Sequence, residues 1–154
     1  MHVKPPERIK RQKRLFLAGS IEQGTAELWQ DVIAQELHGK DVVVVNPRRD
    51  DWNPDWVQSL DNEDFVIQLD WEISELDAAS YVAFYFQAGT KSPISIGEFY
   101  YLLPRVAMGL VNVAVCCPEG FWRKGNIDFM AERFRVHQCY DLDALTTWAV
   151  DSVS

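Results

Sequence analysis

Several features that commonly reveal a function are scarce or missing in this sequence of 154 residues. It has three cysteines, two of them adjacent at Cys116 and Cys117, so it carries neither a secreted disulfide framework nor a recognisable zinc-ligand spacing. No apolar run approaches the length needed to cross a membrane, and no apolar signal segment opens the sequence. We therefore expect a protein of the reducing cytoplasm that does not enter a membrane.

Basic residues are also in short supply, 15 against 23 acidic ones, and the net charge is −8. Neutralising phosphates requires a basic face, so nucleic acid is not an expected partner. Six of the basic residues crowd the first fourteen positions: Lys4, Arg8, Lys10, Arg11, Lys13 and Arg14. We expect residues 1–13 to form a basic N-terminal arm, either solvated or in contact with a phosphate or another subunit, and residues 14–154 to form one domain.

Three common catalytic signatures are absent. The sequence has no GxGxxG fingerprint, no Gly-Lys-Ser/Thr phosphate loop and no GxSxG elbow. Its histidines, His2, His38 and His137, lack the setting of a nucleophilic triad. Acyl transfer is therefore disfavoured.

Short apolar runs alternate with helical patterns along the chain. Strands are predicted at 14–20, 42–46, 81–86, 111–117 and 134–139, and helices at 25–37, 62–79, 92–103 and 141–150. Ser92 and Pro93 are typical of a helix N-cap and first turn, and 47–61 is predicted to be an active-site loop. The alternation predicts an α/β, doubly wound fold: five parallel strands with helices on both faces, and a ligand site beyond the carboxyl ends of the strands.

Glu98 is the one charged residue between Ser92 and Pro104, in an otherwise apolar helical segment. A buried glutamate without a partner is rare, so one interpretation places Glu98 on an exposed stripe, paired with Arg105. The other makes it functional. Gly97 favours the second, because a glycine inside a helix costs about 1 kcal/mol relative to alanine and often marks close approach by a ligand or another backbone.

Glu72 is the second candidate. The helix over 62–79 has an apolar stripe formed by Phe65, Val66, Leu69, Ile73 and Leu76, and Glu72 lies at its margin. Asp70, Glu75 and Asp77 lie further round and are predicted to be surface charges. Two inward carboxylates suit glycosidic chemistry, in which one attacks the sugar carbon or stabilises its charge and the other protonates the leaving group.

A third feature is the turn AGSIEQG after the first strand, where Gly19 and Ser20 would let backbone N–H groups approach a sugar or phosphate. A plain strand-to-helix turn explains the same residues.

Together, the segments LFLAGSI, LDWEISELDAASYVAFYF and SPISIGEFYYL resemble the nucleoside 2-deoxyribosyltransferase family over residues 14 to 117. The resemblance implies a flavodoxin-like sheet, no metal or organic cofactor, and a homodimer or larger homo-oligomer that often completes the site across a subunit boundary. It also implies a covalent deoxyribosyl ester on Glu98, a base-protonating role for Glu72 where relatives commonly have Asp, and a substrate site at Gly19 and Ser20.

The resemblance leaves the substrate open. Ser92 falls where nucleoside transferases often have Asp and where the related deoxynucleoside 5′-monophosphate N-glycosidases have a phosphate-binding Ser. Glu22 stands where those N-glycosidases have Arg, and a carboxylate would repel phosphate. Arg48 and Arg49 offer compensating charge, and Asn46 is a further candidate for substrate contact.

Three hypotheses follow. The first is transfer of the 2-deoxyribosyl group of a nucleoside to another nucleobase, through Glu98, Glu72, Gly97, Gly19, Ser20, Asn46 and Ser92. The second is hydrolysis of deoxynucleoside 5′-monophosphates. The third is a noncatalytic nucleotide-binding module that shares the fold.

Overall fold

The structure is a computed structural model that describes residues 1–8, 13–21, 28–51 and 53–154. Within these residues the strands are β1 (His2–Val3), β2 (Arg14–Gly19), β3 (Val43–Val45), β4 (Tyr81–Tyr85), β5 (Asn112–Cys116) and β6 (His137–Cys139). The helices are α1 (Trp29–Glu36), α2 (Glu63–Ala78), α3 (Pro93–Ala107), α4 (Lys124–Phe134) and α5 (Leu142–Val153).

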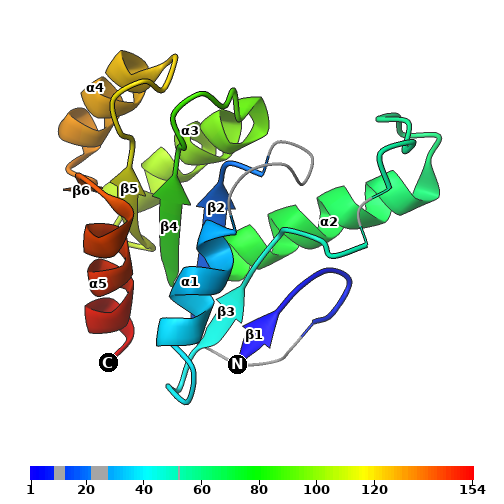
Figure 1. Cartoon of the computed structure of the whole chain (residues 1–154), viewed down its shortest axis with the longest axis horizontal. Helices are drawn as coiled ribbons and strands as arrows, with labels where there is room; N and C mark the ends of the chain where they lie inside the picture. Colours follow the sequence, from blue (N-terminus) through cyan, green and yellow to red (C-terminus); the bar gives the residue numbers. More distant parts are fainter. Residues whose placement is uncertain (9–12, 22–27, 52) are drawn as a thin grey trace.

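All the strands pair in parallel, in the order β1-β3-β2-β4-β5-β6. α1 and α5 cover one face of the sheet, and α2, α3 and α4 cover the other (Figure 1). The predicted doubly wound, flavodoxin-like α/β fold is therefore confirmed. Because the chain passes from β2 to a neighbour on one side and later to β4 on the other, the expected ligand crevice lies outside the carboxyl ends of β2 and β4.

The sheet has one strand more than the five predicted. β1 pairs with Val44 and Val45 of β3 and lies inside the segment expected to be an arm. A two-residue strand is too short to show a periodic pattern. α4 was not predicted either, because Ile127 and Ala131 are the buried residues of its eleven positions and leave only a weak apolar stripe.

Helix boundaries differ from the prediction by three residues or more in α1, α3 and α5, and α5 ends at Val153 where an end at 150 was predicted. α1 begins at Trp29, whereas a start near Thr25 was predicted, and residues 25–27 lie outside the described part of the chain. α3 continues beyond Leu103, through Pro104, to Ala107. A proline has a helical φ and near the end of a helix removes only one backbone hydrogen bond, so Pro104 does not end the helix.

The inner strands are buried on both faces. Leu15 and Leu17 pack with α1 and α5, whereas the alternate residues Phe16 and Ala18 pack on the opposite side. This two-sided burial explains why β2, β3 and β4 read as continuous apolar runs.

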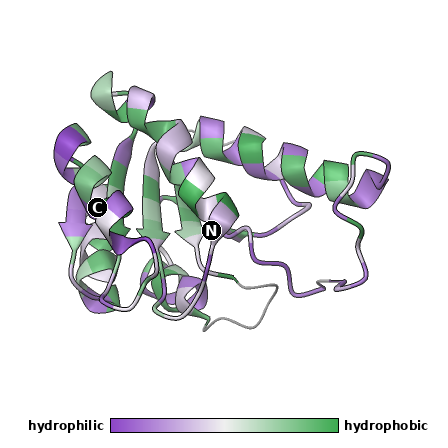
Figure 2. Cartoon of the chain, turned by 90° about the horizontal axis from the view of Figure 1, so that it is seen from above, coloured by the Kyte–Doolittle hydropathy of each residue, from purple (hydrophilic) through white to green (hydrophobic). Residues whose placement is uncertain are grey.

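α2 buries a different face from the one predicted. Its buried residues are Gln68, Trp71, Glu75 and Leu76, so of the predicted stripe only Leu76 is fully covered. Val66 and Ile73 are 37% and 44% exposed, and at about 100° per residue they lie on the other side of the helix. Figure 1 shows α2 extending past the sheet, and Figure 2 shows apolar residues along its whole length. The overhang leaves apolar residues without a core to cover them.

Glu75 is buried, and its prediction as a surface charge was wrong. Its Oε2 lies 3.0 Å from Nε of Arg14, so the partner that permits its burial comes from the start of β2. The predictions for Asp70 and Asp77 are confirmed, since both are exposed.

The described basic residues near the N-terminus contact the rest of the chain. Lys4 pairs with Asp50 at 2.7 Å, Arg8 with Asp70 at 2.8 Å, and Lys13 Nζ donates to the carbonyl of Val153. Lys10 and Arg11 lie outside the described residues. The first strand and these contacts attach the N-terminal segment to the sheet and to α2.

Candidate active site

Glu98 and Glu72 come from different helices, α3 and α2, on the same face of the sheet, and their charges interact. Glu98 is half-buried. Burial, and after it the nearby carboxylate of Glu72, raise the pKa of Glu98 to about 8. The exposed interpretation of Glu98 was therefore wrong, and Arg105 pairs with Asp77 at 3.1 Å instead. The structure brings together the two glutamates predicted from the sequence.

Gln68 contacts Glu72 one helical turn away. Its Nε2 donates to Glu72 Oε1 at 2.6 Å. Burial raises the pKa of Glu72, and the hydrogen bond from Gln68 acts in the opposite direction because it favours the charged form. Gln68 is itself buried, so the hydrogen bond that it donates to Glu72 is shielded from water.

Arg49, from the loop between β3 and α2, holds the other end of Gln68. Its Nη1 donates to Gln68 Oε1 at 3.1 Å. Both carboxylate oxygens of Asp51 accept from the guanidinium, at 2.9 and 3.0 Å, and the ring of Trp56 lies 4.9 Å from it. The loop predicted to belong to the active site thus reaches Glu72 through two side chains.

Three hydroxyl groups meet beyond the carboxyl ends of β2 and β4. Ser20 Oγ lies 2.7 Å from Thr90 Oγ1 and 2.9 Å from Ser92 Oγ, and it accepts from the backbone N–H of Gln87. Ser92 precedes Pro93 at the N-cap position, as predicted, but with φ of 46° and without a side-chain cap. Its hydroxyl instead joins this cluster, which we call the hydroxyl cluster (Ser20, Thr90 and Ser92).

Gly19 has an intramolecular reason to be glycine. Its φ is 145°, and a Cβ there would lie 2.1 Å from the carbonyl oxygen of Tyr85 on β4. Close approach of the neighbouring strand therefore requires Gly19, whatever binds nearby.

Gly97 is open by contrast. Apart from its two chain neighbours and the backbone of its own helix, no atom of the described residues lies within 4 Å of the position a Cβ would take, so no other backbone approaches Gly97. Gly97 itself is exposed, directly before Glu98 on α3.

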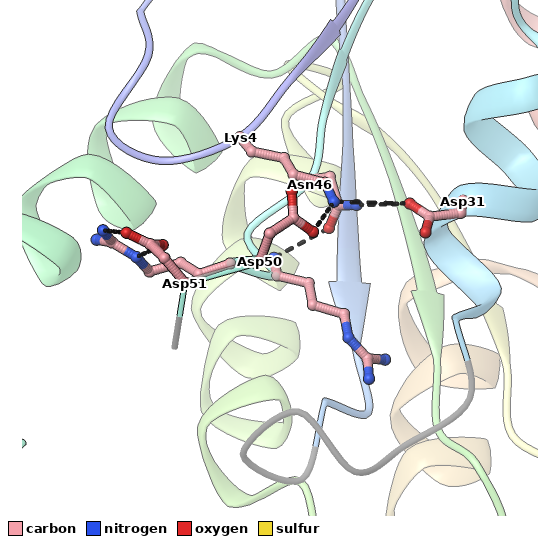
Figure 3. A network of polar contacts seen from close by, with 7 residues as sticks. Lys4, Asp31, Asn46, Asp50 and Asp51 are labelled. Carbon is pink, nitrogen blue, oxygen red and sulfur yellow. Dashed lines mark hydrogen bonds and ion pairs between the residues drawn. The ribbon is translucent and has the colours of Figure 1, made fainter. Parts of the chain in front are cut away.

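Asn46 is buried at the end of β3, and its bonds are to the protein. Its Oδ1 accepts from the N–H of Arg48 at 2.9 Å, and its Nδ2 lies 3.5 Å from Asp31. Figure 3 shows it among Lys4, Asp31 and Asp50. No described contact joins Asn46 to the two glutamates, and its bonds hold the start of the loop that carries Arg49.

Glu22 and Arg48 are the charged residues that bear on a phosphate site. Glu22 lies outside the described residues. Arg48 is buried, and desolvation lowers its pKa while Asp31 and Asp50 oppose the shift.

No group of three metal-ligating side chains is found in the described part of the chain. A cavity of about 740 Å³ lies at the opposite edge of the sheet, beside Asn112 and His137, and contains none of the predicted site residues.

Residues 12–121, more than half of the chain, match the family described as nucleoside 2-deoxyribosyltransferase like. The chain belongs to this family. No curated protein matches the sequence. The matched region of this nucleoside 2-deoxyribosyltransferase-like chain contains both glutamates and the hydroxyl cluster. No helix in the described residues is long and apolar enough to span a membrane.

Sequence reasoning missed Gln68, Arg49 and Thr90. The spacing of Gln68 and Glu72, four residues apart on one helix, was a usable signal, because side chains at that separation are neighbours. Arg49 and Thr90 carried no such signal, since their partners lie in other parts of the sequence.

Proposed function

We propose that this protein cleaves the N-glycosidic bond of 2′-deoxynucleosides and transfers the 2-deoxyribosyl group to another nucleobase, with Glu98 as nucleophile and Glu72 as proton donor. The observation that carries the proposal is the pair of half-buried carboxylates on α2 and α3, in which burial and the charge of Glu72 raise the pKa of Glu98 to about 8. Two interacting carboxylates can share one proton, in which case one is charged while the other is an acid. Glycosidic cleavage uses both forms at once.

The proposed reaction has two balanced steps. First, ionised Glu98 attacks C1′, the bond from C1′ to the base breaks with its electron pair going to the base, and Glu72 gives its proton to the base. The product is a deoxyribosyl ester of Glu98. In the second step an acceptor base attacks C1′, the ester bond breaks to restore the Glu98 carboxylate, and the proton of the acceptor returns to Glu72.

The resting proton position does not alter this scheme. The raised pKa of Glu98 and the Gln68 hydrogen bond to Glu72 favour the proton on Glu98 in the free protein. When the proton moves from Glu98 to Glu72, the pair still holds one proton. The state with the proton on Glu98 and the state with the proton on Glu72 therefore belong to the same ionisation state of the pair. The pH profile should accordingly be bell-shaped and report the pair.

Covalent trapping tests the nucleophile. A 2-fluoro-2-deoxy nucleoside slows breakdown of the ester, and we expect an adduct of the fluorinated sugar on Glu98 by peptide mass spectrometry. Glu98→Gln should not be labelled, whereas Glu36→Gln, on the exposed side of α1, should label normally. An active protein labelled at another residue, or at none, would contradict the role of Glu98. Nucleoside binding without turnover, unchanged in Glu98→Gln, would instead indicate a noncatalytic module.

Hydrolysis of deoxynucleoside 5′-monophosphates is the second candidate, favoured by the hydroxyl cluster at the start of α3. Hydroxyl donors at a helix N-terminus are a suitable environment for a phosphate. Thymidine and its 5′-monophosphate, each with and without adenine, separate the two reactions by chromatography. Deoxyadenosine formation supports transfer. Release of sugar phosphate alone, lost in Ser92→Ala, supports hydrolysis.

A further inference from the structure

Gln68 connects a clamped arginine to the proposed proton donor. Its oxygen accepts from Arg49 at 3.1 Å, and its nitrogen donates to Glu72 Oε1 at 2.6 Å. The amide is buried, so water does not compete freely for either end. Arg49 is in turn fixed by two hydrogen bonds to Asp51 and by the ring of Trp56.

The orientation of the Gln68 amide follows from the chemistry of Arg49. A guanidinium has only donors, so the amide oxygen of Gln68 must face it. The amide NH₂ therefore faces Glu72, and Oε1 of Glu72 must accept. A proton on Glu72 Oε1 would meet the donating NH₂, so the proton has to be carried on Oε2.

We propose that Gln68, locked by Arg49, is a positioning residue that reserves Oε1 of Glu72 and leaves Oε2 as the oxygen that delivers the proton to the departing nucleobase. The proposal rests on the proposed function of Glu72. As Glu72 gives up its proton it becomes a carboxylate, and a hydrogen bond to a carboxylate is stronger than one to a neutral acid. Gln68 thus stabilises the charge that develops on Glu72 in the transition state more than it stabilises the ground state.

A purely structural role for Gln68 is the alternative, since it also ties the loop of Arg49 to α2. The two roles differ in their dependence on the leaving group. A nucleobase needs protonation to depart, whereas a nitrophenolate leaves without it. Loss of positioning should slow cleavage of a nucleoside more than cleavage of a nitrophenyl deoxyriboside. A structural defect should slow cleavage of both substrates equally.

Two variants test the proposal. Gln68→Leu removes both hydrogen bonds, and Gln68→Glu keeps an acceptor for Arg49 but has no donor for Glu72. For each, we expect kcat/KM for thymidine with adenine to fall about tenfold or more, and kcat/KM for 4-nitrophenyl 2-deoxyriboside to fall less than about threefold. Gln35→Leu, an exposed glutamine of α1, is the matched control and should change neither. Circular dichroism identifies a variant that fails to fold, in which case the other decides.

Equal losses for the two substrates would overturn the positioning role. If the wild-type protein cleaves neither substrate, the proposed function fails, and Gln68 is judged by the ¹³C chemical shift of the Glu72 carboxyl in the ligand-free protein. If the pKa of Glu72 is higher in Gln68→Leu than in the wild type and unchanged in Gln35→Leu, the hydrogen bond from Gln68 does influence the ionisation of Glu72. An unchanged pKa overturns it.

Discussion

The carboxylate of Glu72 raises the pKa of Glu98, although the two side chains come from different helices. Glu72→Gln keeps the shape of the side chain and removes its charge. We therefore expect the pKa of Glu98 to fall below about 8 in this variant while staying above 4.5, because burial is the larger cause of the shift. A ¹³C titration of the Glu98 carboxyl measures it. An unchanged value would mean that the two carboxylates do not interact.

The raised pKa of Glu98 also has a consequence for stability. Between the ordinary value of 4.5 and the folded value of about 8, the folded chain binds the proton more tightly than the unfolded chain. The contribution of Glu98 to the free energy of unfolding therefore falls as pH rises through this window. Glu98→Gln should be more stable than the wild type by about 4 kcal/mol at pH 9 and show no such gain at pH 4. Thermal melts at both pH values check this, with Glu36→Gln as the control for loss of one glutamate.

The two glycines of the site should respond in opposite ways to alanine. Gly97→Ala meets no described atom and removes a helix-interior glycine, so we expect a gain of about 1 kcal/mol in stability. If the substrate lies against this surface beside Glu98, the added methyl should raise KM.

Gly19→Ala should instead destabilise the fold by about 3 kcal/mol or more, because its Cβ would overlap Tyr85. Urea unfolding and steady-state kinetics give both quantities. Unchanged kinetics in Gly97→Ala would remove Gly97 from the substrate site.

Much of the fold was predictable because burial on both faces produces unmistakable apolar runs. The segment 42–46 contains β3, and the isolated charge of Glu98 in an apolar helix marked one half of the candidate site. These signals are local: each can be read within one element.

The buried face of α2 was not predictable for a physical reason. Gln68 and Glu75 turn inward because Arg49 and Arg14 satisfy them, and both partners are distant in the sequence. An apolar stripe normally identifies the inner face, but here Val66 and Ile73 belong to the exposed side. In α2, the helix that carries Glu72, contacts with arginines distant in the sequence determine which face is buried, and the hydrophobic pattern does not.

Gln30 is a further exception to ordinary burial. Its side chain is fully buried in the first turn of α1, and neither its amide oxygen nor its amide nitrogen has a hydrogen-bond partner in the described part of the chain. An unsatisfied buried amide costs about 1–3 kcal/mol. Gln30→Met, of similar shape, should therefore stabilise the fold by about 1 kcal/mol. Gln35→Met on the exposed side of α1 is the control.

Kinetics decide why Gln30 is retained. If the amide meets substrate polar groups, the stabilised variant should bind the nucleoside more weakly, since unsatisfied buried groups gather at functional sites. A destabilised Gln30→Met would show that the amide is satisfied in solution, by water or by the protein.

The exposed apolar side of α2 supports the expected homo-oligomer. Val66 and Ile73 lie seven residues apart, about two helical turns, so they project from the same exposed side of α2. Exposed apolar residues that gather on one side of a helix are often covered by a partner. We expect the protein to sediment as a dimer or larger species at micromolar concentration and Val66→Glu to sediment as a monomer.

Phe129→Glu, which adds the same charge to an exposed apolar site on α4, should leave the assembly intact. The activity of these two variants carries the argument further. If a neighbouring subunit helps to enclose the pair Glu72 and Glu98, then Val66→Glu should lose activity in parallel with its dissociation, and dilution of the wild type should lower its specific activity. A wild type that is monomeric at all concentrations would show that α2 is exposed for another reason, and full activity in monomeric Val66→Glu would show that one chain holds the complete site.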